Sequence, residues 1–143
     1  MFLLDANLLL YAYYPRAEQH EASRAWIEET FNGPEQVGLP WPTIWAFLRI
    51  GTNPRAFEQP LSVAEACEVV SSWLELPAVA LVEPGDRHWQ VLSELMPRAQ
   101  VSGPMVSDAV LAALAIEHGA TLCTTDRDFA RFQGLKFINP LLA

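Results

Sequence analysis

Three aspartates stand at positions where their carboxylates could meet. Asp5 directly follows the apolar run 2–4, and Asp126 follows the run 121–125. Asp108 lies near the start of a predicted helix over 105–118. If the two runs are parallel strands, their carboxyl ends face the crevice where such sheets bind ligands. Carboxylates crowded there raise one another's pKa, and a divalent cation such as Mg²⁺ or Mn²⁺ offsets their charge. The pattern therefore favours metal-assisted phosphodiester hydrolysis.

Each aspartate also has a purely structural interpretation. Asp5 could cap a helix starting near Asn7, Asp126 could cap a turn, and Asp108 could simply favour a helix N-terminus. Strand-end aspartates also occur in receiver domains and in dehalogenase-type phosphatases. A dehalogenase-type phosphatase needs a second Asp two positions after the first, where Asn7 stands. The phosphatase alternative is therefore disfavoured.

The elements that would position these carboxylates alternate along the chain. Apolar periodicity, prolines and glycines predict strands at 2–4, 37–39, 79–82, 121–124 and 136–138. They predict helices at 7–14, 17–31, 42–52, 62–76, 86–96 and 105–118, with a capping box formed by Ser62 and Glu65. Short strands alternating with helices indicate an α/β fold, with a parallel sheet and helices on both faces.

The predicted helix 105–118 has a face of small residues. Asp108, Ala112, Ala115 and Gly119 share one side, because steps of three and four residues return to the same face. Such a face lets the helix approach the sheet closely. Its first-turn carboxylate would then meet the edge that carries Asp5 and Asp126.

Composition bounds the class of protein. The 143 residues are 51% hydrophobic and 18% charged, which indicates one folded domain over 1–143 with a sizeable core. No segment is long and apolar enough to span a bilayer, and no signal peptide is recognised, so we expect a cytoplasmic protein. The net charge of −8 argues against a broadly basic nucleic-acid surface. It still allows a local arginine cluster, and it suits a basic protein partner.

Three motifs resemble those of PIN domains. Residues 3–7 (LLDAN) resemble the opening strand motif of that family, in which an Asp and an Asn two positions later begin the active site. Residues 107–109 (SDA) resemble its later helix motif, and residues 124–129 (TTDRDF) its second strand-end motif. Their order and spacing match over residues 2 to about 140, and the length resembles that of a stand-alone VapC-type toxin.

The resemblance implies a three-layer PIN-like fold, with a central, mostly parallel sheet of about five strands flanked by helices. It implies a Mg²⁺-dependent endoribonuclease, with Mn²⁺ as a substitute, that cleaves structured RNA. It further implies a VapB-like antitoxin as partner, and a homodimer. By the same resemblance, Asp5 and Asp108 would be the principal metal ligands, Asp126 would complete the cluster, and Asn7 would orient a carboxylate or a water. Thr124 or Thr125 would support Asp126 by a hydroxyl hydrogen bond, and Asp128 is a weaker candidate.

One segment departs from the PIN pattern. PIN domains commonly carry a further acidic residue on the helix after the second strand, but 42–53 contains no Asp or Glu. Residues 47–52 instead resemble a branch of mycobacterial-type VapC toxins that lack this acid. A catalytically weak PIN-fold binding module therefore stays open as an alternative.

Several other side chains carry expectations. Arg49 is the only charge on its helix, and either pairs with the acidic cluster, grips a substrate phosphate or lies on the surface. Phosphate contacts could also collect at four arginines in predicted loops, Arg16, Arg55, Arg98 and Arg127. Trp41 and Trp45 flank a helix start and could form an exposed partner surface. Cys67 and Cys123 are expected to be buried as small hydrophobic residues.

Overall fold

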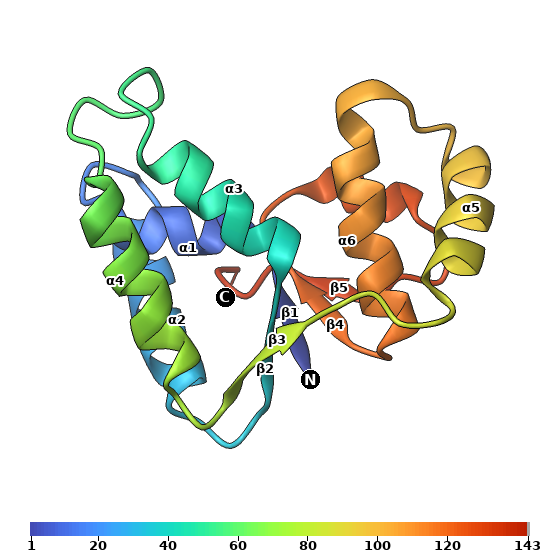
Figure 1. Ribbon diagram of the computed structural model, residues 1–143, viewed down its shortest axis with the longest axis horizontal. Helices are drawn as coiled ribbons and strands as arrows, with labels where there is room; N and C mark the ends of the chain where they lie inside the picture. The colour runs from blue at the N-terminus through green and yellow to red at the C-terminus, as the bar shows by residue number, and fades with distance from the viewer. Residues whose placement is uncertain (143) are drawn as a thin grey trace.

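A five-stranded parallel sheet forms the centre of the molecule (Figure 1). The computed structural model describes residues 1–142. In chain order the strands are β1 (Phe2–Leu4), β2 (Val37–Pro40), β3 (Val79–Val82), β4 (Thr121–Cys123) and β5 (Phe137–Ile138). Their order in the sheet is β3-β2-β1-β4-β5, so the first strand lies in the middle. The predicted strands are confirmed, with their ends displaced by at most one residue.

Helices cover both faces of this sheet, which confirms the three-layer α/β fold (Figure 1). One group contains α1 (Ala6–Tyr13), α2 (His20–Phe31), α3 (Trp41–Gly51) and α4 (Val63–Leu74). The other contains α5 (His88–Ala99) and α6 (Val106–Glu117). Short 3₁₀ helices span Gly103–Met105 and Arg127–Arg131, the second of which is called η2 below. Within residues 1–142, no helix is both long enough and apolar enough to cross a membrane.

Two hydrophobic clusters follow from the alternation of side chains along the strands. Leu3 packs with the α5 and α6 side, whereas its neighbour Leu4 packs with the α1 to α4 side. Successive residues of a strand point to opposite faces, so a strand covered on both faces must be apolar throughout. This explains why the run 2–4 is apolar without a polar interruption until Asp5.

Local signals place the helices close to their predicted positions. The capping box of α4 is present, since the Ser62 hydroxyl accepts from the Glu65 amide at 3.0 Å and the Glu65 carboxylate accepts from the Ser62 amide at 3.0 Å. The small face of α6 is buried as expected, with Ala112 and Ala115 fully enclosed. The predicted helix 86–96 was wrong at its ends, because α5 continues through Pro97 to Ala99. A proline so close to a helix end removes only one backbone hydrogen bond.

The cysteine expectation is half wrong. Cys123 is buried in β4, but Cys67 is exposed on α4. Helix α4 buries Ala66, Val70 and Trp73, and Cys67 lies one position along from Ala66, rotated away from that face. Burial habit alone therefore misplaced this thiol.

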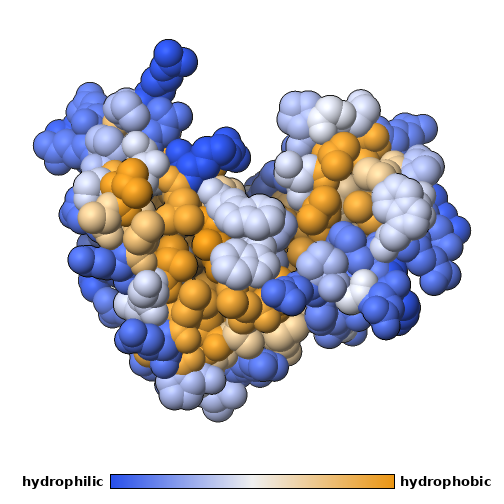
Figure 2. Space-filling model, viewed as in Figure 1, coloured by the Kyte–Doolittle hydropathy of each residue, from blue (hydrophilic) through white to orange (hydrophobic). Residues whose placement is uncertain are grey.

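The face of the molecule shown in Figure 2 has two features that bear on function. A hollow opens between the group containing α3 and the group containing α6. A continuous hydrophobic area extends from α4 across to α3 and down to β3. Of the two tryptophans expected on an exposed surface, Trp45 is 60% exposed but Trp41 is half-buried, and their rings stack with centroids 6.1 Å apart.

Candidate active site at the carboxyl edge of the sheet

Asp5 is held at the end of the central strand by two hydrogen bonds. It caps α1, with Oδ1 accepting from the Ala6 amide at 2.7 Å, while Oδ2 accepts from the Thr124 hydroxyl at 2.8 Å. Strand pairing makes the second bond available, because Leu4 lies opposite Cys123 in the parallel register of β1 and β4. The residues that follow these two strands are therefore neighbours. The capping interpretation is confirmed for Asp5, but it accounts for only one of its two oxygens.

The environment of Asp5 favours the protonated form. Burial raises its pKa from 3.8 to about 6, the hydrogen bonds from Thr124 and Ala6 oppose that rise, and the nearby charges of Asp108 and Asp126 add to it. A carboxylate at this site is costly unless a cation comes close. Such a perturbed carboxyl group at a ligand-binding edge is a recognised sign of a functional site.

Thr124 connects the residues around Asp5. Its buried hydroxyl donates to Asp5, accepts from the Asp126 backbone amide at 3.0 Å, and lies 3.4 Å from Asn7 Nδ2. Asn7 Nδ2 also donates to the Thr125 hydroxyl at 3.0 Å. The sequence had left open which threonine supports Asp126. Thr124 contacts it, through the backbone amide and not the carboxylate, whereas Thr125 supports Asn7.

Asp126 has the capping role that was one of its two interpretations. Its Oδ1 accepts from the Asp128 amide at 2.8 Å at the start of η2. Asp128 itself is exposed, and its charge is among the causes that raise the pKa of Asp108. Asp126 is therefore oriented by its own turn, and Asp128 adds charge at the rim of the site.

Asp108 reaches the same site from helix α6. It lies in the first turn of α6 and is partly buried. Burial raises its pKa, the charge of Asp126 raises it further, and Arg131 opposes the rise. The structure therefore brings Asp5, Asp108 and Asp126 within electrostatic range of one another, as the sequence predicted.

Arg131 is the site residue that sequence reasoning missed. Its charge lowers the pKa of Asp108, and its Nε donates to the Asp128 carbonyl at 3.2 Å. Its guanidinium also contacts the Met105 sulfur, just before α6. The available signal was its position three residues after Asp128, which is one turn of a 3₁₀ helix.

The oxygen-rich donor set fits a hard divalent cation. Within the part of the chain that the structure describes, no three His, Cys, Asp or Glu side chains lie close enough to form a ready-made metal cluster. Mg²⁺ does not require one, because it commonly keeps several waters and binds through one or two carboxylates. Asn7 Oδ1 is a buried acceptor without a hydrogen-bond partner, a position that ordered water of such an ion would satisfy.

Helix α3 supports the site without contributing a charge to it. The Thr43 hydroxyl donates to the Leu4 carbonyl at 2.6 Å, which ties the start of α3 to the end of β1 beside Asp5. Arg49 is exposed and forms no ion pair with any acidic group in residues 1–142, so of its three alternatives the pairing with the cluster is not present. Its exposed position agrees with the surface alternative, and a contact with a substrate phosphate stays a prediction.

The family model of the PIN domain matches residues 2–135. The chain belongs to the PIN domain family. Its relatives include Ribonuclease VapC33 of Mycobacterium tuberculosis, 39% identical over 141 residues, with 99% of each chain covered. Ribonuclease VapC31 of the same species is 40% identical over 143 residues, covering 99% of this PIN domain and 100% of the relative. The resemblance noted in the motifs is confirmed.

Solved structures share the fold of this PIN domain. VapBC2 from Rickettsia felis, bound to a DNA fragment from its promoter, superposes with a TM-score of 0.71 at 17% identity, over 96% of this chain and 97% of the other. The toxin VapC20 of Mycobacterium tuberculosis, described as cleaving the sarcin–ricin loop, has a TM-score of 0.64 at 15% identity, over 95% and 99% of the two chains.

Proposed function

We propose that this PIN domain is an endoribonuclease that hydrolyses RNA phosphodiester bonds and acts as the toxin of a type II toxin–antitoxin pair. The observation that carries the proposal is the site at the carboxyl edge of the sheet, where Asp5 is bonded to Thr124 and its pKa is raised by burial and by the nearby charges of Asp108 and Asp126. The names of its relatives, which are VapC ribonucleases over nearly the whole chain, support the same activity. The matches cover 99% of this chain and at least 99% of each of these two relatives, so the proposal applies to the entire domain.

Asp5 and Asp108 would hold the divalent cation, Mg²⁺ with Mn²⁺ as substitute, with Asp126 completing the acidic cluster. When bound, the ion orients water for attack on phosphorus and offsets charge on the phosphoryl group. Thr124 fixes Oδ2 of Asp5 and the Ala6 amide fixes Oδ1, so one lone pair on each oxygen is left for a cation. Asn7 is held by the threonine hydroxyls, so its unpartnered Oδ1 would accept from water in the site. Asp128 would add negative charge at the rim.

A VapB-like antitoxin is the proposed partner. The solved structures that share this fold include VapBC complexes, and the net charge of −8 suits a basic protein segment. The hydrophobic area between α4 and α3 offers apolar surface for protein contacts, including those of the proposed homodimer (Figure 2). With RNA as substrate, we place this activity in the cytoplasm.

Cleavage of total cellular RNA by the purified, antitoxin-free protein tests the proposal. Parallel reactions would contain Mg²⁺, Mn²⁺ or EDTA, beside Asp108→Asn and the matched control Asp86→Asn, an exposed aspartate in the loop before α5. We expect discrete fragments that require metal, persist in the control and are lost in Asp108→Asn by at least about 100-fold. No cleavage by a folded protein under any of these conditions would favour the binding module instead. Cleavage that survives both EDTA and Asp108→Asn would contradict the proposed site.

A further inference from the structure

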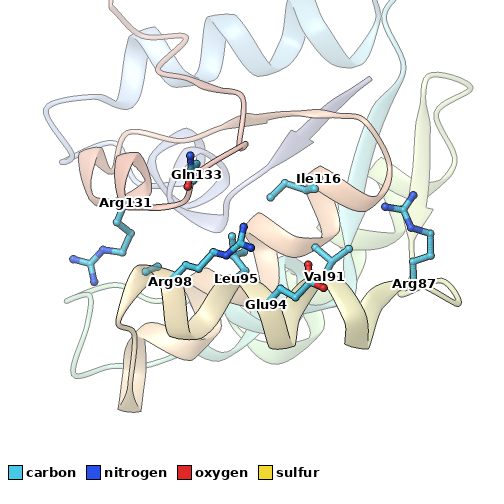
Figure 3. A pocket seen from close by; sticks show the side chains of 9 residues that line it. Arg87, Val91, Glu94, Leu95, Arg98, Ile116, Arg131 and Gln133 are labelled. Atoms are coloured by element: carbon cyan, nitrogen blue, oxygen red, sulfur yellow. The ribbon is translucent and has the colours of Figure 1, made fainter.

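Three of the nine basic residues of this acidic chain line one trough. Arg87, Arg98 and Arg131 border a cavity of about 280 Å³ between α5, α6 and the end of η2 with the segment that follows it. In Figure 3 Arg131 lies at one end, Arg87 at the other, and Arg98 between them. The side chains are spread along the trough, so it presents a line of positive charge and not a single point.

The guanidinium groups of this trough are not committed to carboxylates. Arg16 pairs with Glu58, and Arg24 pairs with two glutamates of its own helix. By contrast, none of the three trough arginines forms an ion pair within residues 1–142, although Glu94 lines the same cavity. The donors of Arg87 and Arg98 are therefore available to an anion, whereas Arg131 already donates to the Asp128 carbonyl and contacts the Met105 sulfur. Arginine forks match phosphate oxygens well.

One end of the trough adjoins the candidate active site. The charge of Arg131 acts on Asp108, and its Nε donates to the carbonyl of Asp128. From Arg131 the line continues to Arg98 in the last turn of α5 and then to Arg87, the residue just before that helix. A strand whose phosphate is cleaved at the carboxylates would pass along this line.

We propose that this trough is a phosphate-binding subsite for the single RNA strand that flanks the scissile bond. The inference rests on the proposed nuclease function, and it names where the substrate is gripped. Through Arg98 and Arg87 the protein contacts successive phosphates of the flanking nucleotides, independently of base identity. These local positive charges counter the repulsion expected between RNA and a chain of net charge −8.

The test measures RNA affinity in a background that binds but does not cleave, Asp5→Asn with Mg²⁺ present. Labelled single-stranded RNAs of about 4 and about 12 nucleotides compare a ligand confined to the carboxylates with one that reaches the trough. The test variant combines Arg87→Gln and Arg98→Gln, leaving Arg131 intact because it also influences Asp108. Arg16→Gln with Arg24→Gln removes the same charge elsewhere and is the matched control.

We expect the test variant to bind the longer RNA about tenfold more weakly, while its affinity for the shorter RNA and the control's affinities change less than about twofold. For two lost phosphate contacts, the slope of log affinity against log salt should fall in magnitude by about 1.4. Unchanged affinity for the longer RNA, or an equal loss in the control, would overturn the subsite. So would a loss of antitoxin binding without loss of RNA binding. Failure of the nuclease itself is separate, because it would appear as absent cleavage in the protein with an intact trough.

Discussion

Replacing Asp5 with asparagine is expected to stabilise the metal-free protein at neutral and alkaline pH. The side chain is partly buried, and its pKa is raised from 3.8 to about 6, mainly by burial. The folded state therefore binds the proton of this carboxyl group more tightly than the unfolded state does. The resulting stability is fully present below pH 3.8 and is lost as the pH rises through about 6.

The size of this effect follows from the difference between the two pKa values. At 1.36 kcal/mol per pH unit, this difference corresponds to about 3 kcal/mol in the free energy of unfolding. The wild type loses this stability above pH 7, where the carboxyl group of Asp5 is ionised. Asparagine carries no charge but must rearrange the bond with Thr124, at a cost of about 1 kcal/mol. The net gain at pH 8 is about 2 kcal/mol in the free energy of unfolding, or roughly 6 °C in Tm.

Urea unfolding in EDTA between pH 5 and pH 8 measures the difference directly. The free-energy gap between Asp5→Asn and wild type should widen by about 1 kcal/mol over this range, because the carboxyl group of Asp5 releases its proton there. Asp86→Asn, at an exposed position, should follow the wild type throughout. Addition of Mg²⁺ should raise the stability of the wild type more than that of Asp5→Asn.

A gap that stays constant from pH 5 to pH 8 would refute this reasoning, since the environment of Asp5 would then not disfavour its charge. A gap that widens equally in Asp86→Asn would assign the effect to overall charge instead.

Two further substitutions test other contacts. Thr124→Val keeps the shape of the side chain but removes the hydroxyl that bonds both the Asp5 carboxylate and the Asp126 backbone amide. We expect the free energy of unfolding to fall by about 1 to 3 kcal/mol and the cleavage rate to fall at least about tenfold. A variant that cleaves at the wild-type rate would show that this hydrogen bond does not position the carboxylates. A thiol reagent should modify Cys67 in the folded protein and reach Cys123 only after unfolding, because Cys67 is exposed and burial raises the pKa of Cys123 to about 12. Mass spectrometry of the labelled protein measures this difference. Equal labelling of both cysteines in the folded state would contradict their placement.

Much of the fold could be predicted because its signals are local. The apolar run before Asp5, the capping box at Ser62 and the alternation of strands and helices all depend on residues close in the chain. The order of the strands does not. No sequence signal paired β1 with β4, and that pairing is what makes Asp5 a neighbour of Thr124.

The candidate site shows the same division. The three aspartates could be chosen from their positions at strand and helix ends, but the partner of each oxygen could not. Arg131 was missed because its influence on Asp108 depends on how η2 folds back toward α6, which periodicity does not reveal. Arg49 was overvalued for a similar reason, since a lone charge on an apolar helix points to solvent unless tertiary structure supplies a partner.

The central position of β1 also sets when activity can arise during synthesis. Asp5 and Thr124 are 119 residues apart, so the ribosome adds more than four-fifths of the chain after the first carboxylate before its hydrogen-bond partner exists. At roughly 5 to 20 residues per second, this takes roughly 6 to 24 s. A nascent chain that lacks β4 holds Asp5 on an unfinished sheet, with neither Thr124 nor Asp126 beside it. Each translating ribosome would thus carry a harmless precursor for most of the time it takes to make the protein.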